Sequence, residues 1–313
     1  MQATSTQSNG GSRLVLILSS ERSGSTLLRV ILGAHSRIVA PSEFFLMRYP
    51  DYQTWRSQKP VAIESLVEYF RLLRSPRTAA EIDATCQRLS TVEVYRRLLS
   101  ALPQGMFLVD KTPAYANSMD TLRRSLALDP DYIWLIRHPL AVIESHVRIK
   151  TQKSGTHRLQ ALRERIREYA EVLVGSHNTE TNLLARLREM KWLLQQTNIN
   201  EFLSSVPHTR KTVVHFEDLV QAPEATLQVL CSGLGIAIEA SMLQVRLKDQ
   251  KMNPNLGDPN FHTHTRVEQR KAFAWRGRFS ESQLGIEAVN LMRAIGVGQE
   301  FAERQPWMRE PRG

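Results

Sequence analysis

Four short runs of aliphatic and β-branched residues stand out along the chain, and each is followed by a stretch in which apolar residues recur every three to four positions. Short apolar runs predict buried strands, and the longer period predicts amphipathic helices. The predicted strands are Leu14–Leu18, Phe107–Val109, Tyr132–Ile136 and Thr212–His215. This alternation favours an α/β fold in which helices flank a central parallel sheet.

The other helical patterns predict insertions on this sheet. The longest runs from Arg158 to about Leu203 and predicts two helices broken near Gly175–His177, and further amphipathic helices are expected between Pro60 and Leu102. The polar, proline-containing stretch Asn253–His264 predicts a loop, and long loops in compact domains are often functional. No linker-like segment interrupts the interior, so we expect a flexible leader at residues 1–12, one domain at 13–305 and a tail at 306–313.

Composition narrows the class of protein. With 42% hydrophobic and 23% charged residues among 313, the chain has the composition of a globular protein rather than of a disordered, collagen-like or disulfide-stapled one. Cys86 and Cys231 form no C-x-x-C pair, which fits a reducing compartment. The sequence contains neither a signal peptide nor an apolar run of membrane-spanning length, so we expect a cytoplasmic protein without a membrane partner.

Net charge is the one unusual quantity. The chain has 41 Lys and Arg against 31 Asp and Glu, a net charge of +10. A nucleic acid, a phosphorylated cofactor, an acidic protein or a membrane surface would each complement this charge, and a basic surface without function is an alternative. Aromatic residues make up only 7% of the chain and no recognition-helix motif is present, which disfavours a basic nucleotide- or nucleic-acid-binding protein without enzymatic activity.

The first predicted strand runs into a loop of small polar residues and then into a helical pattern, which is the context of a phosphate-binding turn. Gly24 permits close backbone approach to an anion, the helix N-terminus attracts it, and Arg22 adds a fixed positive charge. The first glycine and the lysine of a Walker A loop are missing, which disfavours a kinase or nucleotide hydrolase. The alternative is a plain turn capped by Ser23 or Ser25.

A second candidate site follows the strand Tyr132–Ile136. Arg137 ends this strand, Pro139 suits the first turn of the next helix, and Ser145 lies eight residues after Arg137. Both side chains are expected to meet one phosphate beside the first loop. The alternatives are a surface charge for Arg137 and a packed small residue for Ser145.

The segments RSGSTLL and LIRHPLAVIES resemble the two-part signature of sulfotransferases that use 3′-phosphoadenosine-5′-phosphosulfate (PAPS), which is released as adenosine 3′,5′-bisphosphate (PAP). Three more segments resemble the family, PSEFF, FLVDKTPAY and HFEDLVQAPEATLQVLCSGLGI, so that roughly Leu14–Arg278 is covered. The resemblance implies the P-loop-like sulfotransferase fold and an enzyme without metal. It implies that the 5′-phosphosulfate is bound by Arg22, Ser23, Gly24, Ser25 and Thr26, and the 3′-phosphate by Arg137 and Ser145.

One position departs from the commonest family pattern. Many members carry Lys where Arg22 stands, so the charge is retained but a planar fork replaces a point donor. Arg occurs there in other branches of the family. In the late segment around Trp275, the resemblance implies that Arg276 or Arg278 reaches the 3′-phosphate, whereas a solvated basic turn with a half-buried Trp275 is the alternative.

Sulfuryl transfer needs positive charge around the transferring group and a base for the acceptor hydroxyl. Arg22 and Lys111 are the candidates for the charge, and His262 and Glu43 for the base. Glu43 follows Pro41 and Ser42 in a loop, at a position where several branches of the family have a catalytic carboxylate. His262 is preferred because imidazole titrates near neutral pH. His264 alternates with it, but no third ligand lies nearby, so no metal is expected.

The loop around His262 is similar to one in bacterial sulfotransferases associated with polyketide assembly lines. That resemblance implies a β-hydroxyacyl chain on an acyl carrier protein as the acceptor. A net charge of +10 would complement an acidic carrier protein. The alternative acceptor is a hydroxyl of a small free metabolite or a glycan.

Overall fold

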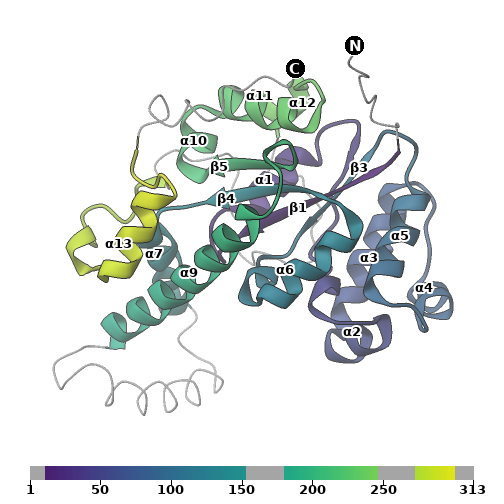
Figure 1. Cartoon of the computed structure of the whole chain (residues 1–313), viewed down its shortest axis with the longest axis horizontal. Helices are drawn as coiled ribbons and strands as arrows, with labels where there is room; N and C mark the ends of the chain where they lie inside the picture. The colour runs from purple at the N-terminus through teal and green to yellow at the C-terminus, as the bar shows by residue number, and fades with distance from the viewer. Residues whose placement is uncertain (1–10, 153–179, 246–271, 300–313) are drawn as a thin grey trace, which may run out of the picture.

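Five parallel strands form one sheet in the order β2-β3-β1-β4-β5. Figure 1 shows β3, β1, β4 and β5 of this sheet in a computed structural model that describes residues 11–152, 180–245 and 272–299. The strands are β1 (Arg13–Ser19), β2 (Ile38–Val39), β3 (Phe107–Lys111), β4 (Asp131–Ile136) and β5 (Lys211–His215). The four predicted strands and the α/β class are therefore confirmed. The additional strand, β2, is only two residues long, too short for a sequence pattern.

Helices cover both faces of the sheet, which explains why its strands are apolar almost without interruption. Leu14, Leu16 and Leu18 of β1 pack into one hydrophobic cluster, and Val15 and Ile17 pack into another on the opposite face. The helices are α1 (Ser25–Leu32), α2 (Tyr52–Gln58), α3 (Ile63–Leu72), α4 (Ala79–Cys86), α5 (Thr91–Ala101), α6 (Met119–Ser125), α7 (Pro139–Gln152), α9 (Glu180–Ser204), α10 (Phe216–Gln221), α11 (Pro223–Leu234), α12 (Ala240–Leu243) and α13 (Ile286–Ala294). Short 3-10 helices lie at Leu46–Arg48, Pro60–Ala62, Pro113–Asn117, Leu126–Leu128, His208–Arg210 and Glu281–Gln283.

The helical insertions that lie within the described residues fall where the sequence predicts them. Helices α3, α4 and α5 occupy the region between Pro60 and Leu102, and capping boxes begin the last two. Helix α7 begins at Pro139, and α9 accounts for the second of the two helices expected up to Leu203. The first of those helices, the loop Asn253–His264 and the tail lie outside the described residues, so the domain limits remain predictions.

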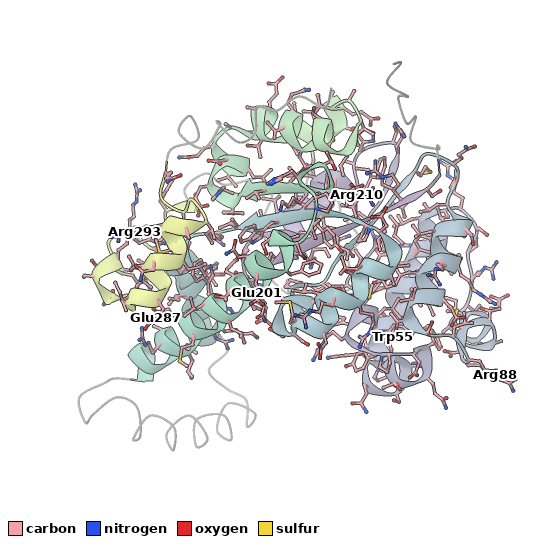
Figure 2. All side chains as sticks on the ribbon, in the orientation of Figure 1. Trp55, Arg88, Glu201, Arg210, Glu287 and Arg293 are labelled. Atoms are coloured by element: carbon pink, nitrogen blue, oxygen red, sulfur yellow. The ribbon has the colours of Figure 1, made fainter. Side chains whose placement is uncertain are left out.

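The interior and the periphery differ as expected for such a fold. Figure 2 shows charged side chains, among them Arg88, Glu287 and Arg293, at the periphery, whereas Trp55 is fully buried. No helix within the described ranges is long and apolar enough to cross a lipid bilayer.

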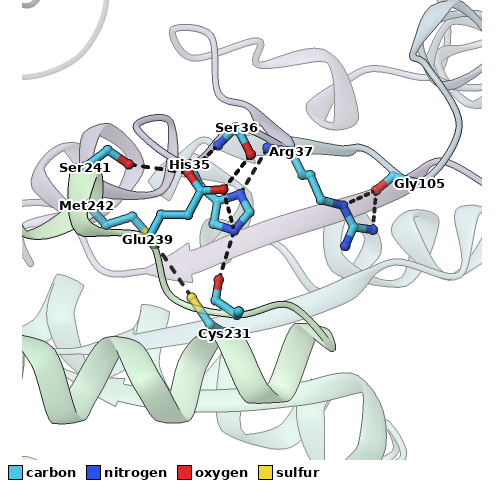
Figure 3. A network of polar contacts seen from close by, with 9 residues as sticks. His35, Ser36, Arg37, Gly105, Cys231, Glu239, Ser241 and Met242 are labelled. Atoms are coloured by element: carbon cyan, nitrogen blue, oxygen red, sulfur yellow. Dashed lines mark hydrogen bonds and ion pairs between the residues drawn. The ribbon is translucent and has the colours of Figure 1, made fainter.

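A polar network fixes the segment after α11 to the turn between α1 and β2 (Figure 3). The Glu239 carboxylate accepts hydrogen bonds from the backbone amide of Ser36 at 2.8 Å and from its hydroxyl at 2.5 Å. Nε2 of His35 lies 3.0 Å from the carbonyl oxygen of Ala237. These contacts hold the turn after α1 and the segment after α11 together, far from the carboxyl ends of the strands.

Register places the candidate chemistry at one edge of the sheet. Ile17 of β1 is level with Lys111 of β3 and with Ile133 of β4, so the carboxyl ends of these three strands lie side by side. Ligands of parallel α/β sheets bind at this edge. The loop after β1, the Lys111 segment and Arg137 are therefore brought together by topology.

Candidate functional site

The loop between β1 and α1 has a conformation that requires glycine. Arg22 and Gly24 both adopt left-handed backbone conformations, with φ of 65° and 87°. A Cβ on Gly24 would lie 2.3 Å from Cδ2 and Cε2 of Phe216, so the space is filled as well. Helix α1 begins at Ser25 with Gly24 as its N-cap, and the Ser23 hydroxyl instead contacts that of Ser20 at 2.6 Å. The alternative of a serine-capped turn is therefore wrong.

The two predicted phosphate sites meet at Arg22. Nη1 of Arg137 donates to the carbonyl oxygen of Arg22 at 2.9 Å, and Nε of Arg22 donates to Oγ of Ser145 at 3.2 Å. Arg137 is only 8% exposed, so the alternative of a surface charge is wrong. Ser145 is buried, as a packed small residue would be, but its hydroxyl is also a hydrogen-bond acceptor at the loop.

Arg137 lies in an environment that holds a charged guanidinium in place. Its guanidinium carbon lies 4.2 Å from the centre of the Phe216 ring, a cation-π contact. Burial lowers the pKa of Arg137 to about 10, while the nearby Glu217 carboxylate opposes that shift, so the group is protonated at neutral pH. Burial in turn raises the pKa of Glu217, whose Oε1 accepts a hydrogen bond from the amide of His138.

Lys111 links the donor loop to Glu43. Its ammonium donates to Oγ1 of Thr26 at 3.2 Å and forms an ion pair with Oε1 of Glu43. The two side chains are 2% and 12% exposed. Burial lowers the pKa of Lys111, and the Glu43 carboxylate opposes that shift. Two candidate catalytic residues that are 68 positions apart in sequence are thus in direct contact beside α1.

A buried network behind this ion pair was not predicted from the sequence. The Asp110 carboxylate accepts hydrogen bonds from the Tyr95 hydroxyl, from the Tyr115 hydroxyl at 2.7 Å and from the Thr112 hydroxyl at 3.0 Å. The Thr112 hydroxyl in turn accepts a bond from the amide of Phe45 at 3.3 Å, two residues after Glu43. The network therefore joins the end of β3 to the segment that carries Glu43. Burial raises the pKa of Asp110.

Helix α9 supplies a second set of unpredicted contacts to the donor loop. Oε1 of Gln195 accepts from the amide of Glu21 at 3.2 Å, and Nε2 of Gln196 donates to the Ser20 hydroxyl at 3.3 Å. The indole of Trp192 donates to the carbonyl oxygen of Arg137 at 3.0 Å. Trp192, Gln195 and Gln196 are spaced so that they lie on one face of α9. The sequence pattern alone does not show which part of the protein this face contacts.

Phe216 is a further residue that the sequence did not single out. It lies in the HFEDL segment directly after β5, and its ring contacts both Arg137 and the space beside Gly24. Its place in this segment, which resembles the family, was an indication that the sequence offered, but it did not show which residues the ring contacts.

The late basic segment reaches α7. Nη1 of Arg278 donates to Oε1 of Glu144 at 3.2 Å, next to Ser145 in the chain. The Trp275 ring stacks on that of His138 with centroids 4.3 Å apart and is 8% exposed, so it is buried rather than half-buried. Arg276 and Arg278 are exposed, and the Arg276 guanidinium lies 4.2 Å from the centre of the Phe273 ring. His262 lies outside the described residues.

Within the described ranges, no group of three or more His, Cys, Asp or Glu side chains is arranged to hold a metal ion. The site is instead a set of positively charged side chains around a glycine-containing loop.

Comparison with known proteins identifies the family of this chain. The sequence profile of the sulfotransferase family matches residues 15–240. The nodulation protein NoeE of Sinorhizobium fredii (strain NBRC 101917 / NGR234) is 25% identical over 295 residues, which is 92% of this chain. The chain spans 66% of the length of this curated relative.

Solved structures are similar over nearly the whole chain. The sulfotransferase domain from the curacin biosynthetic pathway superposes with a TM-score of 0.71 at 28% identity, covering 92% of this chain and 99% of that domain. The sulfotransferase domain from the Synechococcus PCC 7002 olefin synthase has a TM-score of 0.71 at 24% identity, covering 95% of this chain and 98% of that domain. The P-loop-like fold is the same.

Proposed function

The chain belongs to the sulfotransferase family, and we propose that it transfers the sulfuryl group of PAPS to a hydroxyl group on its acceptor. The observation that carries the donor assignment is the convergence of Arg137, Arg22 and Ser145 at one loop. PAPS has two anionic ends, and positive or hydrogen-bonding groups from two separate chain segments meet where those ends would be bound.

Each end of the donor has its own set of residues. The 5′-phosphosulfate would be held by the loop amides and by the side chains of Arg22, Ser23, Ser25 and Thr26, with Gly24 allowing the close approach. The 3′-phosphate would be held by Arg137 and Ser145. Arg278, anchored to Glu144 beside Ser145, and the exposed Arg276 would close over that end.

PAPS supplies the sulfuryl group, and the chain supplies charge and a base. Arg22 and the Lys111 ammonium stabilise negative charge that develops on the transferring group and on the departing phosphate oxygen. Thr26 and Glu43 hold Lys111 in place for that role. His262 or Glu43 takes the proton of the acceptor hydroxyl. In either case the Asp110 network keeps the Glu43 segment in position.

We propose a β-hydroxyacyl chain on an acyl carrier protein as the acceptor. Two similar solved structures are sulfotransferase domains from the curacin pathway and from an olefin synthase, which supports an acyl-chain context. A net charge of +10 supports an acidic protein partner.

Calorimetric titration with PAP, with ATP and GTP as controls, tests the donor. We expect 1:1 binding of PAP and much weaker binding of the two triphosphates. We expect Arg137→Gln to weaken PAP binding by about 2 kcal/mol, roughly 30-fold, because a charge-assisted contact is lost. Arg123→Gln, at an exposed arginine of α6, is the matched control. A folded protein that does not bind PAP, or an unchanged affinity in Arg137→Gln, would contradict the donor assignment.

A further inference from the structure

A chain of hydrogen bonds runs from the sheet through α9 into the loop between β1 and α1. The indole Nε1 of Trp134, on β4, donates to Oε1 of Gln196 at 2.7 Å. Nε2 of Gln196 donates to Oγ of Ser20 at 3.3 Å, and that hydroxyl lies 2.6 Å from the hydroxyl of Ser23. All four residues are buried, and Gln196 and Ser23 are fully so. The chain therefore connects the interior of the protein to the loop assigned to the 5′-phosphosulfate.

The direction of these hydrogen bonds follows from the first member of the chain. An indole N–H can only donate, so the amide oxygen of Gln196 must face Trp134 and its NH2 group must face Ser20. An NH2 group can only donate as well, so the oxygen of Ser20 accepts from it. The proton of the Ser20 hydroxyl is thereby left to be donated elsewhere, and the Ser23 oxygen is its neighbour.

One hydroxyl proton at the end of the chain has no acceptor among the described residues. Ser20 and Ser23 share a single hydrogen bond, so only one of their two protons is used in it. When Ser20 donates, the unused proton is that of Ser23, which lies between Arg22 and Gly24 in the loop assigned to the 5′-phosphosulfate. A phosphosulfate oxygen accepts hydrogen bonds, so an anion bound by this loop satisfies the chain in that direction.

The contact between the two serines also closes the turn that presents Arg22. The amide of Ser23 donates to the carbonyl oxygen of Ser20 at 3.4 Å, and Arg22, within this turn, has a left-handed φ of 65°. That conformation is unfavourable for a residue other than glycine and persists only where surrounding contacts enforce it. The amide of Gln196 supports this turn from the interior of the protein.

We propose that Gln196 is a positioning residue for PAPS, which acts through Ser20 to direct the hydroxyl proton of Ser23 toward the 5′-phosphosulfate. This rests on the proposed function, which assigns that end of PAPS to the loop. The indole of Trp134 sets the polarity of the chain, and the Gln196 amide transmits it. Gln196 thereby affects recognition of PAPS without touching it.

The neighbouring Gln195 holds the same loop by a different route. Its Oε1 accepts from the amide of Glu21 at 3.2 Å, and its Nε2 donates to Oδ1 of Asn117 at 2.8 Å. It is as fully buried as Gln196, but within the described ranges its hydrogen bonds go to these two residues and not to the serines. Gln195→Glu is therefore the matched control for Gln196→Glu, because both add a buried carboxylate beside the loop and only the second acts on the chain.

Calorimetry with PAP and with adenosine 3′-monophosphate isolates the 5′ end, because the second ligand lacks the 5′-phosphate. The ratio of its dissociation constant to that of PAP measures what the 5′-phosphate contributes. In Gln196→Glu at pH 8.5, the carboxylate accepts from both Trp134 and Ser20, so the chain reverses and the Ser23 oxygen faces the phosphate. We expect this variant to lower the ratio about tenfold more than Gln195→Glu does, as for a lost hydrogen bond to a charged group. Gln196→Met removes the amide without adding charge and is expected to lower the ratio about threefold.

Ser23→Ala shows whether Gln196 acts through the hydroxyl. In that background we expect Gln196→Met to have no further effect and Gln196→Glu to lower the ratio no more than Gln195→Glu does. The effect of Gln195→Glu should be the same in both backgrounds. Equal effects of the Gln196 variants with and without the Ser23 hydroxyl, or wild-type ratios in both variants, would overturn the positioning role. A wild-type protein that binds the two ligands equally, or binds neither, would instead contradict the proposed function, because the loop would not hold the 5′ end.

Discussion

The ring of Phe216 serves two neighbours at once. It supports the guanidinium of Arg137 at 4.2 Å, and it occupies the space where any side chain on Gly24 would project. A change at Gly24 therefore reaches Arg137 through one aromatic ring. This coupling joins the two ends of the donor site at the level of single residues.

Gly24→Ala tests that coupling. We expect it to lower the free energy of unfolding by clearly more than Gly235→Ala, the matched control. Both glycines are left-handed, with φ of 87° and 74°, but a Cβ on Gly235 would meet no atom within 4 Å. The control isolates the conformational penalty, about 1–2 kcal/mol. Urea unfolding gives the stabilities, and calorimetry gives PAP affinity, which we expect to fall in Gly24→Ala alone. Equal losses of stability would show that the Phe216 ring yields without cost.

Single-residue variants also test which side chain is the general base. We expect His262→Ala to lower kcat by about 100-fold or more, the usual contribution of a general base, with PAP affinity unchanged. Glu43→Gln is the companion variant, because it removes the only other candidate and leaves the Lys111 ammonium without its ion pair. Steady-state turnover and calorimetry are measured on both. If turnover survives in His262→Ala and is abolished in Glu43→Gln, the base is Glu43.

At the scale of secondary-structure elements, the site residues that could be predicted are those whose partners lie close to them in the sequence. The loop after β1, Arg137 at the end of β4, and Pro139 at the start of α7 lie in strand-loop-helix units whose pattern is local. The Asp110 network and the α9 face could not be predicted in this way. Tyr95 lies on α5 and Asp110 on β3, and nothing in either segment specifies the other.

Packing between α7 and α9 gives the molecule a predicted sensitivity to acid. His146 has an ordinary pKa of 6.5 and a pKa of about 2 in the folded protein, caused first by burial and then by Arg188, Arg22 and Lys191. The unfolded chain therefore binds a proton that the folded one does not. Stability from this group is fully present above pH 6.5 and is lost as the pH falls below it, by at most about 1.4 kcal/mol per pH unit.

Urea unfolding at pH 7.5 and 5.5 measures this effect. We expect the wild-type protein to lose about 1 kcal/mol more over this range than His146→Gln. His208→Gln, at an exposed histidine before β5, is the control and should retain the wild-type pH dependence. The burial of His138 also lowers its pKa, but it contributes equally to all three proteins. Parallel pH profiles for wild type and His146→Gln would show that His146 titrates normally in the folded state.

At the scale of the whole molecule, the sheet divides structural from chemical roles. At the amino end of β4, Asp131 pairs with Arg13, and Arg210 lies 3.1 Å from Asp129 and 3.7 Å from Asp131, so the two positive charges there face two carboxylates. At the carboxyl ends of the strands, the basic side chains converge around the donor loop. The chain as a whole carries a net charge of +10, which adds a long-range attraction for acidic partners.

Salt dependence separates that long-range attraction from recognition of the acyl chain itself. For a 3-hydroxyacyl carrier protein at saturating donor, we expect kcat/KM to fall about tenfold or more between 0.05 and 0.5 M NaCl, because screening removes steering between surfaces of opposite charge. The same acyl chain on pantetheine lacks the acidic protein surface, and its kcat/KM should change much less. Both substrates share the donor, the hydroxyl and the thioester, so the difference between their salt slopes reports on the carrier surface alone. Equal slopes would contradict charge-guided docking of the carrier protein. If pantetheine serves as well as the carrier at low salt, the carrier protein is not part of what the enzyme recognises.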